Sequence, residues 1–262
     1  MLKRLKNTVR GAVPWPFLYL YREIRSFPQD VPYILRLLFL KPKVPAGFFK
    51  RFGLVCQCYK ISFFVDCPHM EGEMLQVMAT ILSLDSAEKG AVVEAGSYKG
   101  GSGAKISLAV KLAGRQLILF DSFQGLPEHR ETHGKNIYGG DAFFPAGSYK
   151  GTLEEVKDAI HKYGCPEVCR FEKGWFEETM PRFSEKVAVA YIDVDLKFST
   201  EVALIYLHPL LSGHGVIFSQ DGHLPWIIEL LGDRNFWRSK LKIELPRMRG
   251  LGTKKLVAIF SN

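Results

Sequence analysis

Three aspartates follow predicted strands, at positions where a charge could take part in chemistry. Asp193 and Asp195 come after one apolar, β-branched run, and Asp221 follows the next such run. Buried carboxylates are costly unless a cation or hydrogen-bond donors meet them. Because neighbouring parallel strands end at one edge of a sheet, we expect the three side chains to share one mouth. Hard cations such as Mg²⁺ take oxygen ligands, so the pattern predicts a hard-metal site.

A glycine-rich segment is a second candidate binding element. It reads Glu94-Ala-Gly-Ser-Tyr-Lys-Gly-Gly-Ser102 and continues another β-branched run. Glycines let the backbone turn sharply and approach a ligand closely, and the helix expected after them would present free N–H groups. A dinucleotide fingerprint would need glycine in place of Glu94, and a P-loop would need lysine in place of Ser102. The Glu94 carboxylate would repel a pyrophosphate and suits a ligand with a cationic amino-acid group, which argues against a nucleotide-dependent oxidoreductase.

Asp121 ends another predicted strand. At that position, the adenosine ribose of a cofactor lying across the sheet edge would place its two hydroxyls within reach of the carboxylate. The same arrangement serves NAD enzymes, so this residue alone does not choose the cofactor. The alternative interpretation is an aspartate that caps a helix or closes a turn.

The elements that must position these residues begin at residue 89, where short β-branched runs alternate with helical stretches. Seven runs are predicted as strands: 91–96, 116–121, 168–173, 187–193, 215–220, 241–245 and 255–260. Helices are expected around 104–112, 153–163, 200–211 and 226–231, and a further helix over 68–88 leads into the sheet. This alternation is typical of an α/β protein with an open, mostly parallel, doubly wound sheet.

Residues 122–150 interrupt the alternation with a stretch rich in glycine. A connection of this length in a compact domain is usually a lid or a binding loop. It holds four ring-bearing side chains that could face a substrate, namely His129, His133, Tyr138 and Tyr149. Taken singly, each is better interpreted as a solvated or locally packed residue.

The first 67 residues differ from the remainder in composition, and we interpret them as a basic helical arm before a catalytic domain over 68–262. The chain has a formal net charge of +8, yet residues 1–60 hold twelve Lys and Arg against only Glu23 and Asp30. The basic excess is therefore local, and no nucleic-acid partner is expected. Residues 1–45 either pack on their own domain or on a second subunit of a homo-oligomer, or form a basic, amphipathic membrane-surface contact.

The cysteines and the start of the chain favour a cytoplasmic protein that could associate with a membrane surface. The five cysteines are Cys56, Cys58, Cys67, Cys165 and Cys169. They could gather a zinc ion, but free thiols in a reducing compartment are the preferred interpretation. The apolar stretch after the basic start is broken by Pro14 and Pro16, unlike that of a signal peptide. No run approaches the roughly 18 apolar residues of a spanning helix.

Four blocks of the sequence carry a family resemblance. They are Glu94-Ala-Gly-x₃-Gly-Gly-Ser, Asp121-Ser-Phe-Gln-Gly-Leu-Pro-Glu128, Lys173-Gly-Trp-Phe-Glu-Glu-Thr-Met-Pro181, and Ile192-Asp-Val-Asp-Leu-Lys-Phe-Ser-Thr200 followed by Gln220-Asp221. In their types and order, over about residues 68–225, they resemble the macrocin O-methyltransferase family. The resemblance implies a class I, S-adenosylmethionine-dependent fold and methyl transfer to sugar hydroxyls on macrolides and related natural products.

The resemblance also implies roles for individual residues. The methionine end of the cofactor would be held by Glu94, Gly96, Gly100, Gly101 and Ser102, the ribose by Asp121 with Ser122 beside it, and the adenine edge by Gly174 and Trp175. Magnesium would be bound by Asp193, Gln220 and Asp221. Asp195 would be the general base, and His223 is a rival base.

The sequence departs from the family pattern at two of these positions. Gln220 stands where the family has a carboxylate, and Gly222 stands where an aromatic residue is usual. An amide oxygen is still an acceptable magnesium ligand, but metal affinity should fall with the lost charge. The acceptor pocket should also differ from that of the family.

The function expected from the sequence is therefore an S-adenosylmethionine-dependent O-methyltransferase, assisted by Mg²⁺. The reaction would be an in-line displacement at the sulfonium methyl, in which the enzyme aligns two substrates and removes the proton of the acceptor. Magnesium would lower the pKa of the acceptor hydroxyl. The acceptor would be a hydroxyl of a small molecule, a sugar or a glycosylated metabolite. The alternative is a catalytically weak cofactor-binding protein that acts through its basic N-terminal arm at a partner or membrane surface.

Overall fold

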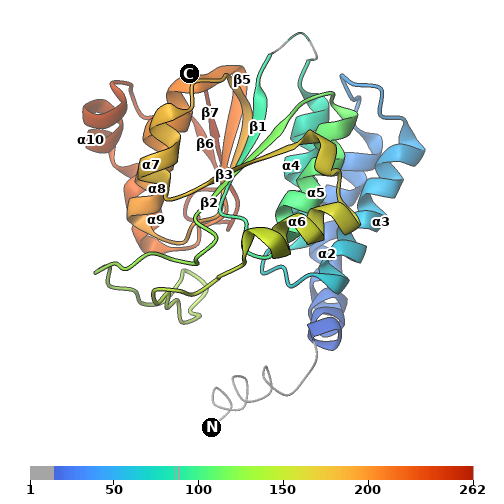
Figure 1. Cartoon of the computed structure of the whole chain (residues 1–262), viewed down its shortest axis with the longest axis horizontal. Helices are drawn as coiled ribbons and strands as arrows, with labels where there is room; N and C mark the ends of the chain where they lie inside the picture. The colour runs from blue at the N-terminus through green and yellow to red at the C-terminus, as the bar shows by residue number, and fades with distance from the viewer. Residues whose placement is uncertain (1–14, 86, 88, 262) are drawn as a thin grey trace.

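The computed structural model describes residues 15–85, 87 and 89–261, and Figure 1 shows a central sheet between two groups of helices. The strands are β1 (Ala91–Ala95), β2 (Leu117–Asp121), β3 (Cys169–Lys173), β4 (Val187–Ile192), β5 (Leu211–Ser219), β6 (Met248–Arg249) and β7 (Val257–Phe260). The helices are α2 (Trp15–Phe39), α3 (Phe48–Phe64), α4 (Glu71–Ser83), α5 (Gly101–Leu112), α6 (Leu153–Tyr163), α7 (Phe176–Thr179), α8 (Lys197–Leu207), α9 (Pro225–Gly232) and α10 (Arg234–Phe236). Four short turns complete the set: η1 (Pro166–Val168), η2 (Met180–Arg182), η3 (His208–Leu210) and η4 (Trp237–Leu241).

Seven strands form one sheet in the described residues, in the order β3-β2-β1-β4-β5-β7-β6. Strands β1 to β5 are parallel, β7 runs antiparallel to β5, and β6 runs antiparallel to β7. The predicted open, mostly parallel, doubly wound sheet is thus confirmed. The chain winds outward from β1 to β3 on one side and from β4 to β5 on the other. Loops after β1 and β4 therefore diverge, which opens a crevice at the carboxyl ends of these strands.

The central strands are almost wholly apolar, apart from Glu94 in β1, because helices cover both faces of the sheet. All residues of β1 and β4 are buried. Val92 packs into the cluster that α4 and α5 cover, whereas its neighbour Val93 packs into the cluster under α8 and α9. Successive side chains of a strand point to opposite faces, so one strand contributes to both layers of the core.

Helices α2 and α3 join the first of these layers. Leu37 and Ile61 have no exposed surface and belong to the same cluster as the central strands. The buried Asp30 accepts hydrogen bonds from the Gly72 backbone N–H at 2.8 Å and from the Tyr59 hydroxyl at 3.0 Å, which ties α2 to α3 and α4. Residues 1–14 of the proposed arm lie outside the described residues, and the domain division at residue 67 stays a prediction.

The expected strand over 241–245 is wrong. Trp237–Leu241 forms the π-helical turn η4, the chain then runs irregularly, and the edge strand β6 begins only at Met248. The apolar side chains Leu241, Ile243 and Leu245 pack against the second core cluster from a loop. Their alternation therefore reflects burial without strand pairing. The helix expected over 68–88 is shorter, since α4 spans Glu71–Ser83.

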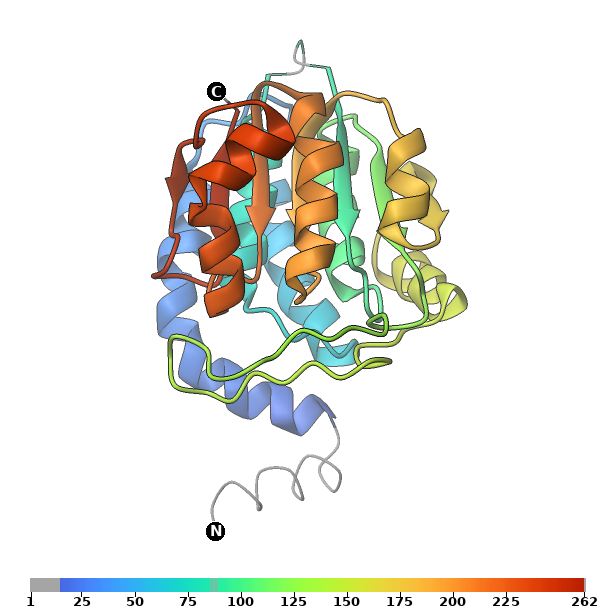
Figure 2. The same ribbon diagram turned by 90° about the vertical axis from the view of Figure 1, so that its left-hand side faces the viewer.

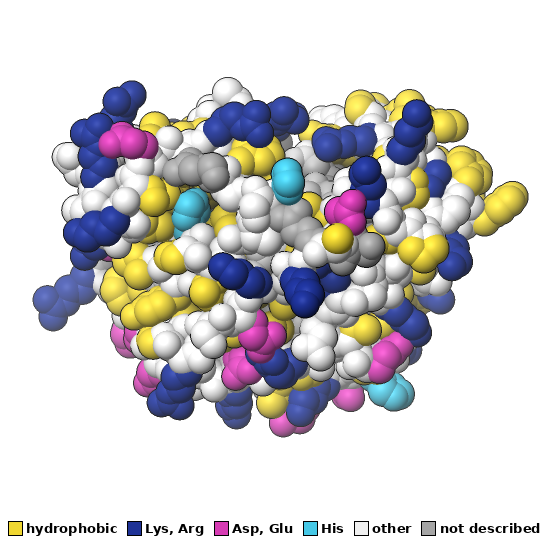
Figure 3. All heavy atoms as spheres, turned by 90° about the horizontal axis from the view of Figure 1, so that it is seen from above, with side chains coloured by type: hydrophobic (Ala, Val, Ile, Leu, Met, Phe, Trp, Pro, Cys, Tyr) yellow, Lys and Arg dark blue, Asp and Glu magenta, His cyan; other side chains and the backbone are white. Residues whose placement is uncertain are grey.

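Residues 122–150 run beneath the carboxyl ends of the strands, and Figure 2 shows this loop crossing below α8 and α9. Figure 3 views the opposite end of the molecule, where Lys and Arg side chains are spread among apolar, acidic and uncharged ones. In the described part of the chain, no helix is long and apolar enough to cross a membrane. All five cysteines are free thiols. They take no part in the group of possible metal ligands found among the described residues, so nothing supports the zinc alternative.

Candidate active site

A cavity of about 560 Å³ lies at the carboxyl ends of the parallel strands. Ligands of open α/β sheets bind at this position, beside the point where the strand order reverses. The predicted site residues that line it are Gly96, Gly101, Ser102, Asp121, Ser122, Gly174, Trp175, Asp193, Asp195, Gln220, Asp221 and His223. Glu94 and Gly100 do not line it. The fold thus brings residues from five strand ends to one place.

Asp193, Asp195 and Asp221 form the acidic part of this cavity. One carboxylate oxygen of each lies within 4.8 Å of the others. Asp221 is buried, and its Oδ2 accepts the backbone N–H groups of Val194 at 3.1 Å and of Asp195 at 2.9 Å. These bonds tie the loop after β4 to the end of β5. The Asp193 Oδ2 accepts the Tyr191 hydroxyl at 3.1 Å.

The three carboxyl groups resist ionising together. Burial, followed by the charge of Asp221, raises the pKa of Asp193 to about 8. Burial raises the pKa of Asp221 to about 6, although its two backbone donors oppose the shift. The pKa of Asp195 is raised by burial and by its two acidic neighbours. Lys255 opposes these shifts through space, yet among the described residues no Lys or Arg nitrogen lies within 4.0 Å of the three carboxylates. A divalent cation beside the three carboxyl groups would favour their ionised forms and lower their pKa values. The set of oxygen donors therefore fits a hard metal ion.

Asp195 has a backbone conformation that non-glycine residues rarely adopt. Its φ angle is +59°, in the left-handed region. The indole N–H of Trp226 donates to its backbone carbonyl at 2.8 Å and so fixes this turn. Strained residues of this kind persist where the surroundings determine them, and they are frequent at functional sites.

His223 is held on the other side of the cavity by aromatic packing. Its ring stacks on that of Tyr138, with ring centroids 6.2 Å apart and planes 20° apart. Burial, together with the charge of Lys255, lowers the pKa of His223 to about 4. The imidazole is therefore neutral at pH 7 and a weaker base than an ordinary histidine.

Gln220 lies between the acidic group and helix α4. Its side chain is 5% exposed, and its amide Nε2 donates to Glu73 Oε2 at 2.6 Å. Its Oε1 is buried, with no hydrogen-bond partner in the described residues. A buried acceptor left without a partner costs about 1–3 kcal/mol. This oxygen is thus suited to receive a ligand of the cavity.

The glycines after β1 permit close approach of three chain segments. Gly96 has a φ of +88°, and a Cβ there would collide with the Asp193 carbonyl oxygen. A Cβ on Gly101 would collide with Cys67 Sγ. Gly100 has a φ of +80°, caps α5 and packs against Val156 outside the cavity. The first two glycines shape the cavity wall, and the third shapes the turn behind it.

Glu94 lies beneath the first turn of α5. It is fully buried, and a Cβ on Gly103 would lie 2.7 Å from its Oε2. Burial raises the pKa of Glu94 to about 8, although the nearby Ser102 side chain opposes the shift. Its place behind Ser102 suits an indirect effect on the cavity. Direct contact with the cofactor stays a prediction.

Asp121 organises the turns around the side of the cavity where the cofactor is expected to bind. Its Oδ2 accepts the Ser97 backbone N–H and its Oδ1 accepts the Phe123 backbone N–H, each at 2.7 Å. Burial raises its pKa, and these donors oppose the shift. Each carboxylate oxygen retains capacity for a second hydrogen bond. The turn-closing and ribose-binding interpretations are therefore compatible.

The turns after β2 and β3 complete this side. The Ser122 hydroxyl accepts the Gln124 backbone N–H at 3.1 Å and donates to the Gly125 carbonyl at 3.3 Å. The Gly174 backbone N–H donates to the Asp121 carbonyl at 3.0 Å, and Trp175 caps α7. These bonds hold Gly174 and Trp175, which are predicted to lie at the adenine edge, next to Asp121, the predicted ribose ligand.

The loop over 122–150 is anchored across the cavity by Glu131. The two oxygens of its carboxylate accept the backbone N–H groups of Lys197 at 2.9 Å and Phe198 at 3.0 Å, at the first turn of α8. A carboxylate is favoured at the positive end of a helix. Of the four ring-bearing residues that could face a substrate, His129 and Tyr149 line the cavity. His133 instead packs against Trp226, with ring centroids 4.7 Å apart.

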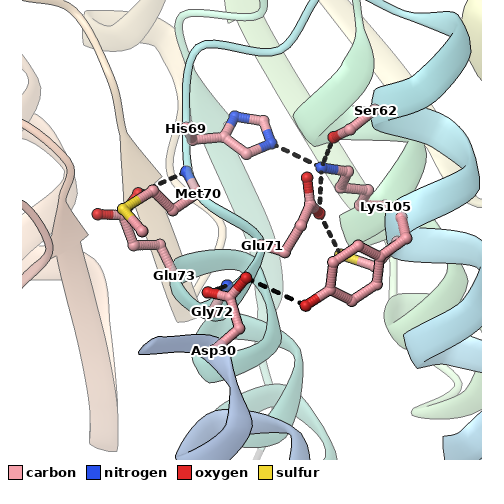
Figure 4. Close-up of polar contacts among 10 residues, drawn as sticks. Asp30, Ser62, His69, Met70, Glu71, Gly72, Glu73 and Lys105 are labelled. Carbon is pink, nitrogen blue, oxygen red and sulfur yellow. Dashed lines mark hydrogen bonds and ion pairs between the residues drawn. The ribbon is translucent and has the colours of Figure 1, made fainter. Parts of the chain in front are cut away.

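The N-terminal end of α4 contributes residues that sequence analysis missed. Lys105 of α5 is fully buried, and its Nζ donates to Glu71 Oε2 at 2.7 Å, to the Ser62 hydroxyl, and to His69 Nε2 at 3.0 Å (Figure 4). Burial alone would lower the pKa of Lys105, but the charge and hydrogen bond of Glu71, together with the neighbouring Cys58 and Cys67, outweigh it and raise that pKa. A lysine on the apolar face of a predicted helix is the signal that could have revealed this cluster. His69 also lines the cavity.

The chain matches the family described as Macrocin-O-methyltransferase (TylF) over residues 72–240. It is similar in structure to the O-methyltransferase NovP, with 20% identity, coverage of 90% of this chain and 99% of that one, and a TM-score of 0.59. For calicheamicin methyltransferase CalS11, identity is 16%, coverage 89% and 91%, and the TM-score 0.56. For the SAH-bound methyltransferase PaMTH1 of Podospora anserina, identity is 12%, coverage is 91% of this chain and 96% of that one, and the TM-score is 0.50. No curated protein matches the chain.

The family match and the structure agree with each other. The matched residues include the whole of α5 and the strand ends of β1, β2, β4 and β5, which surround the cavity. The structural likeness, at these low identities, supports the class I methyltransferase fold alone. The match covers more than half of the chain, and the chain therefore belongs to the macrocin-O-methyltransferase family of S-adenosylmethionine-dependent O-methyltransferases.

Proposed function

We propose that the protein transfers a methyl group from S-adenosylmethionine to a hydroxyl of a small molecule, a sugar or a glycosylated metabolite, with Mg²⁺ bound at the aspartates. The observation that carries this proposal is the convergence of Asp193, Asp195 and Asp221 in the cavity that the glycine segment also lines. When bound, the cofactor supplies an electrophilic methyl group and the metal ion withdraws charge from the acceptor oxygen.

The cofactor would lie along the loops after β1, β2 and β3. Gly96, Gly101 and Ser102 line the cavity and would hold the methionine end of the cofactor, and Asp121, which also lines it, would bind the ribose. Trp175 lines the same cavity and would contact the adenine. Gly100 would act from behind the cavity wall by shaping the turn. Glu94 would act from behind the same wall by its electrostatic effect.

The metal ligands would be Asp193, Asp221 and the Gln220 Oε1. Two observations support this set: the carboxylate oxygens of the aspartates lie within 4.8 Å of each other, and the amide oxygen is buried without a hydrogen-bond partner among the described residues. Three oxygen donors with two negative charges are a fitting set for Mg²⁺, which retains water or substrate oxygens at its other positions.

Asp195 would take the proton from the acceptor hydroxyl. Burial and its two acidic neighbours raise the pKa of Asp195, which favours the uptake of a proton by this carboxylate. His223, with a pKa of about 4, is a weaker candidate for the same role. The anchored turn at Asp195 would hold the base in one position relative to the acceptor.

Calorimetric titration of the purified protein tests this proposal without knowledge of the acceptor. S-adenosylmethionine and MgCl₂ should each bind, and NAD⁺ should not. Asp121→Ala should weaken S-adenosylmethionine binding by about 1.5–3 kcal/mol, the range for hydrogen bonds to a charged group. An absence of S-adenosylmethionine binding, or tight NAD⁺ binding, would contradict the proposal.

A second proposed role, at a membrane surface, has support from the N-terminal helices. Ile24, Phe39 and Phe49 are 70%, 72% and 86% exposed, and Arg25 and Lys50 are exposed on the same helices. Exposed apolar and basic side chains together suit an anionic lipid surface. The full chain should sediment with anionic vesicles at low salt, and Phe39→Ser with Phe49→Ser should abolish this. If vesicles are not bound and the double variant changes a dimer into a monomer, the surface is an oligomer contact.

A further inference from the structure

The first turn of α4 carries two glutamates with opposite orientations. Glu71 is directed to Lys105, and Glu73 is directed away from that cluster (Figure 4). Glu73 is the third residue of the helix, and its Oε2 accepts the Met70 backbone N–H at 2.9 Å. This bond, together with the positive end of the helix, fixes the Glu73 carboxylate at the helix terminus.

The contact of Glu73 with Gln220 determines which way the Gln220 amide faces. Glu73 Oε2 accepts the Met70 N–H and also accepts a hydrogen bond, at 2.6 Å, from the NH₂ of the Gln220 amide. Two donors on one oxygen are the arrangement that suits a carboxylate without a proton. The amide oxygen is left on the other side, buried, at the wall of the cavity that Asp193 and Asp221 also line.

We propose that Glu73 is a positioning residue of the metal site, because it holds the Gln220 oxygen toward the cavity. From its position behind Gln220, Glu73 also supplies the negative charge that a carboxylate at position 220 would carry. Glu73 does not line the cavity. This inference rests on the proposed magnesium requirement. Residues behind metal ligands orient them and raise their affinity for the ion in this way.

The pair also explains why a carboxylate at position 220 alone should fail to create a working site. In Gln220→Glu, which keeps the length of the side chain, the new carboxylate would face Glu73 across a contact that now measures 2.6 Å between amide nitrogen and carboxylate oxygen. Two carboxylates at that distance cannot both ionise. Exchanging the two groups, in Glu73→Gln with Gln220→Glu, keeps one charge and one amide and restores the hydrogen bond.

The experiment measures Mg²⁺ binding by calorimetry and thermal unfolding for the full chain and three variants. Glu73→Gln should weaken Mg²⁺ binding about 10- to 100-fold, as for other residues behind metal ligands. Gln220→Glu should lower the melting temperature, and the exchanged double variant should recover both the melting temperature and Mg²⁺ binding. Glu155→Gln is the matched control, because Glu155 is the third residue of α6, caps it through the Thr152 N–H, and does not line the cavity.

The outcomes separate the two levels of the proposal. If the unmodified chain binds no Mg²⁺, the proposed metal-assisted function is wrong and the role of Glu73 falls with it. If the unmodified chain binds Mg²⁺ and Glu73→Gln binds it equally well, only the positioning role is wrong. A purely structural role predicts that Glu73→Gln lowers the melting temperature as Glu155→Gln does and leaves Mg²⁺ affinity unchanged. Should Glu73→Gln not fold, failure of the double variant to bind Mg²⁺ would overturn the inference.

Discussion

Two groups of charged residues, one fully buried and one lining the cavity, differ in how their charge is balanced. Lys105 and Glu71 form an ion pair at 2.7 Å with no exposed side-chain surface. Asp193, Asp195 and Asp221 bring three carboxylates together with no Lys or Arg nitrogen within 4.0 Å in the described part of the chain. The first group contains its own counter-charge, and the second lacks it.

This difference separates structure from function. A buried pair with mutual hydrogen bonds fixes the relative positions of α3, α4 and α5, and nothing further has to bind there. A group of carboxylates with raised pKa values is stable at neutral pH only if protons or a cation compensate it. We therefore expect substitutions in the first group to change stability and those in the second to change metal binding and turnover.

Removing the proposed base should give the largest effect. Asp195→Asn should lower turnover about 10²- to 10⁴-fold, the usual contribution of general base catalysis. Mg²⁺ binding should change little, because the proposed ligands remain. The measurement is methyl transfer from labelled S-adenosylmethionine to any hydroxylated acceptor that supports turnover. Near-normal turnover in Asp195→Asn, with loss of turnover in His223→Gln, would assign the base to His223.

Breaking the self-balanced pair should affect stability most. Lys105→Met leaves Glu71 buried without its cation and should destabilise the fold by about 3–5 kcal/mol in urea unfolding. Lys99→Met is the matched control, because Lys99 pairs with Asp66 at 3.4 Å on the surface, where an ion pair contributes about 0–1 kcal/mol. Equal effects of the two substitutions would show that burial does not distinguish these pairs.

The sequence predicted one of these groups and not the other, for a physical reason. Asp193, Asp195 and Asp221 directly follow strands whose periodicity is local, and parallel strands bring their ends together. The other group joins Lys105 of α5 to Glu71 of α4, 34 positions apart, through the packing of two helices. The contact of Glu73 with Gln220 likewise joins residues 147 positions apart. Helical spacing predicted the helix that carries Glu73, but not which of its side chains would reach the sheet. The place of Glu94 behind the cavity wall likewise depends on how closely α5 approaches β1.

The pH dependence of stability should give a smaller difference, because the aspartate cavity is partly open to solvent. The folded-state pKa of Asp193 is about 8, against an ordinary value of 3.8, so the folded protein binds a proton that the unfolded chain releases. Stability in EDTA should therefore fall as pH rises from about 4 to about 8. Glu94, with a pKa of about 8, adds to the same trend. Melting temperatures across this range should depend less on pH in Asp193→Asn, and an unchanged slope would contradict this assignment.

The most direct test of the unbalanced aspartate group is the effect of Mg²⁺ on thermal unfolding, with Asp193→Asn as the comparison. A ligand that binds only the folded state at tenfold its dissociation constant adds about 1.4 kcal/mol of stability. The unmodified chain should show this saturable stabilisation by Mg²⁺, and Asp193→Asn should show none. Equal melting temperatures of the unmodified chain in EDTA and in saturating Mg²⁺ would contradict a metal site at these carboxylates.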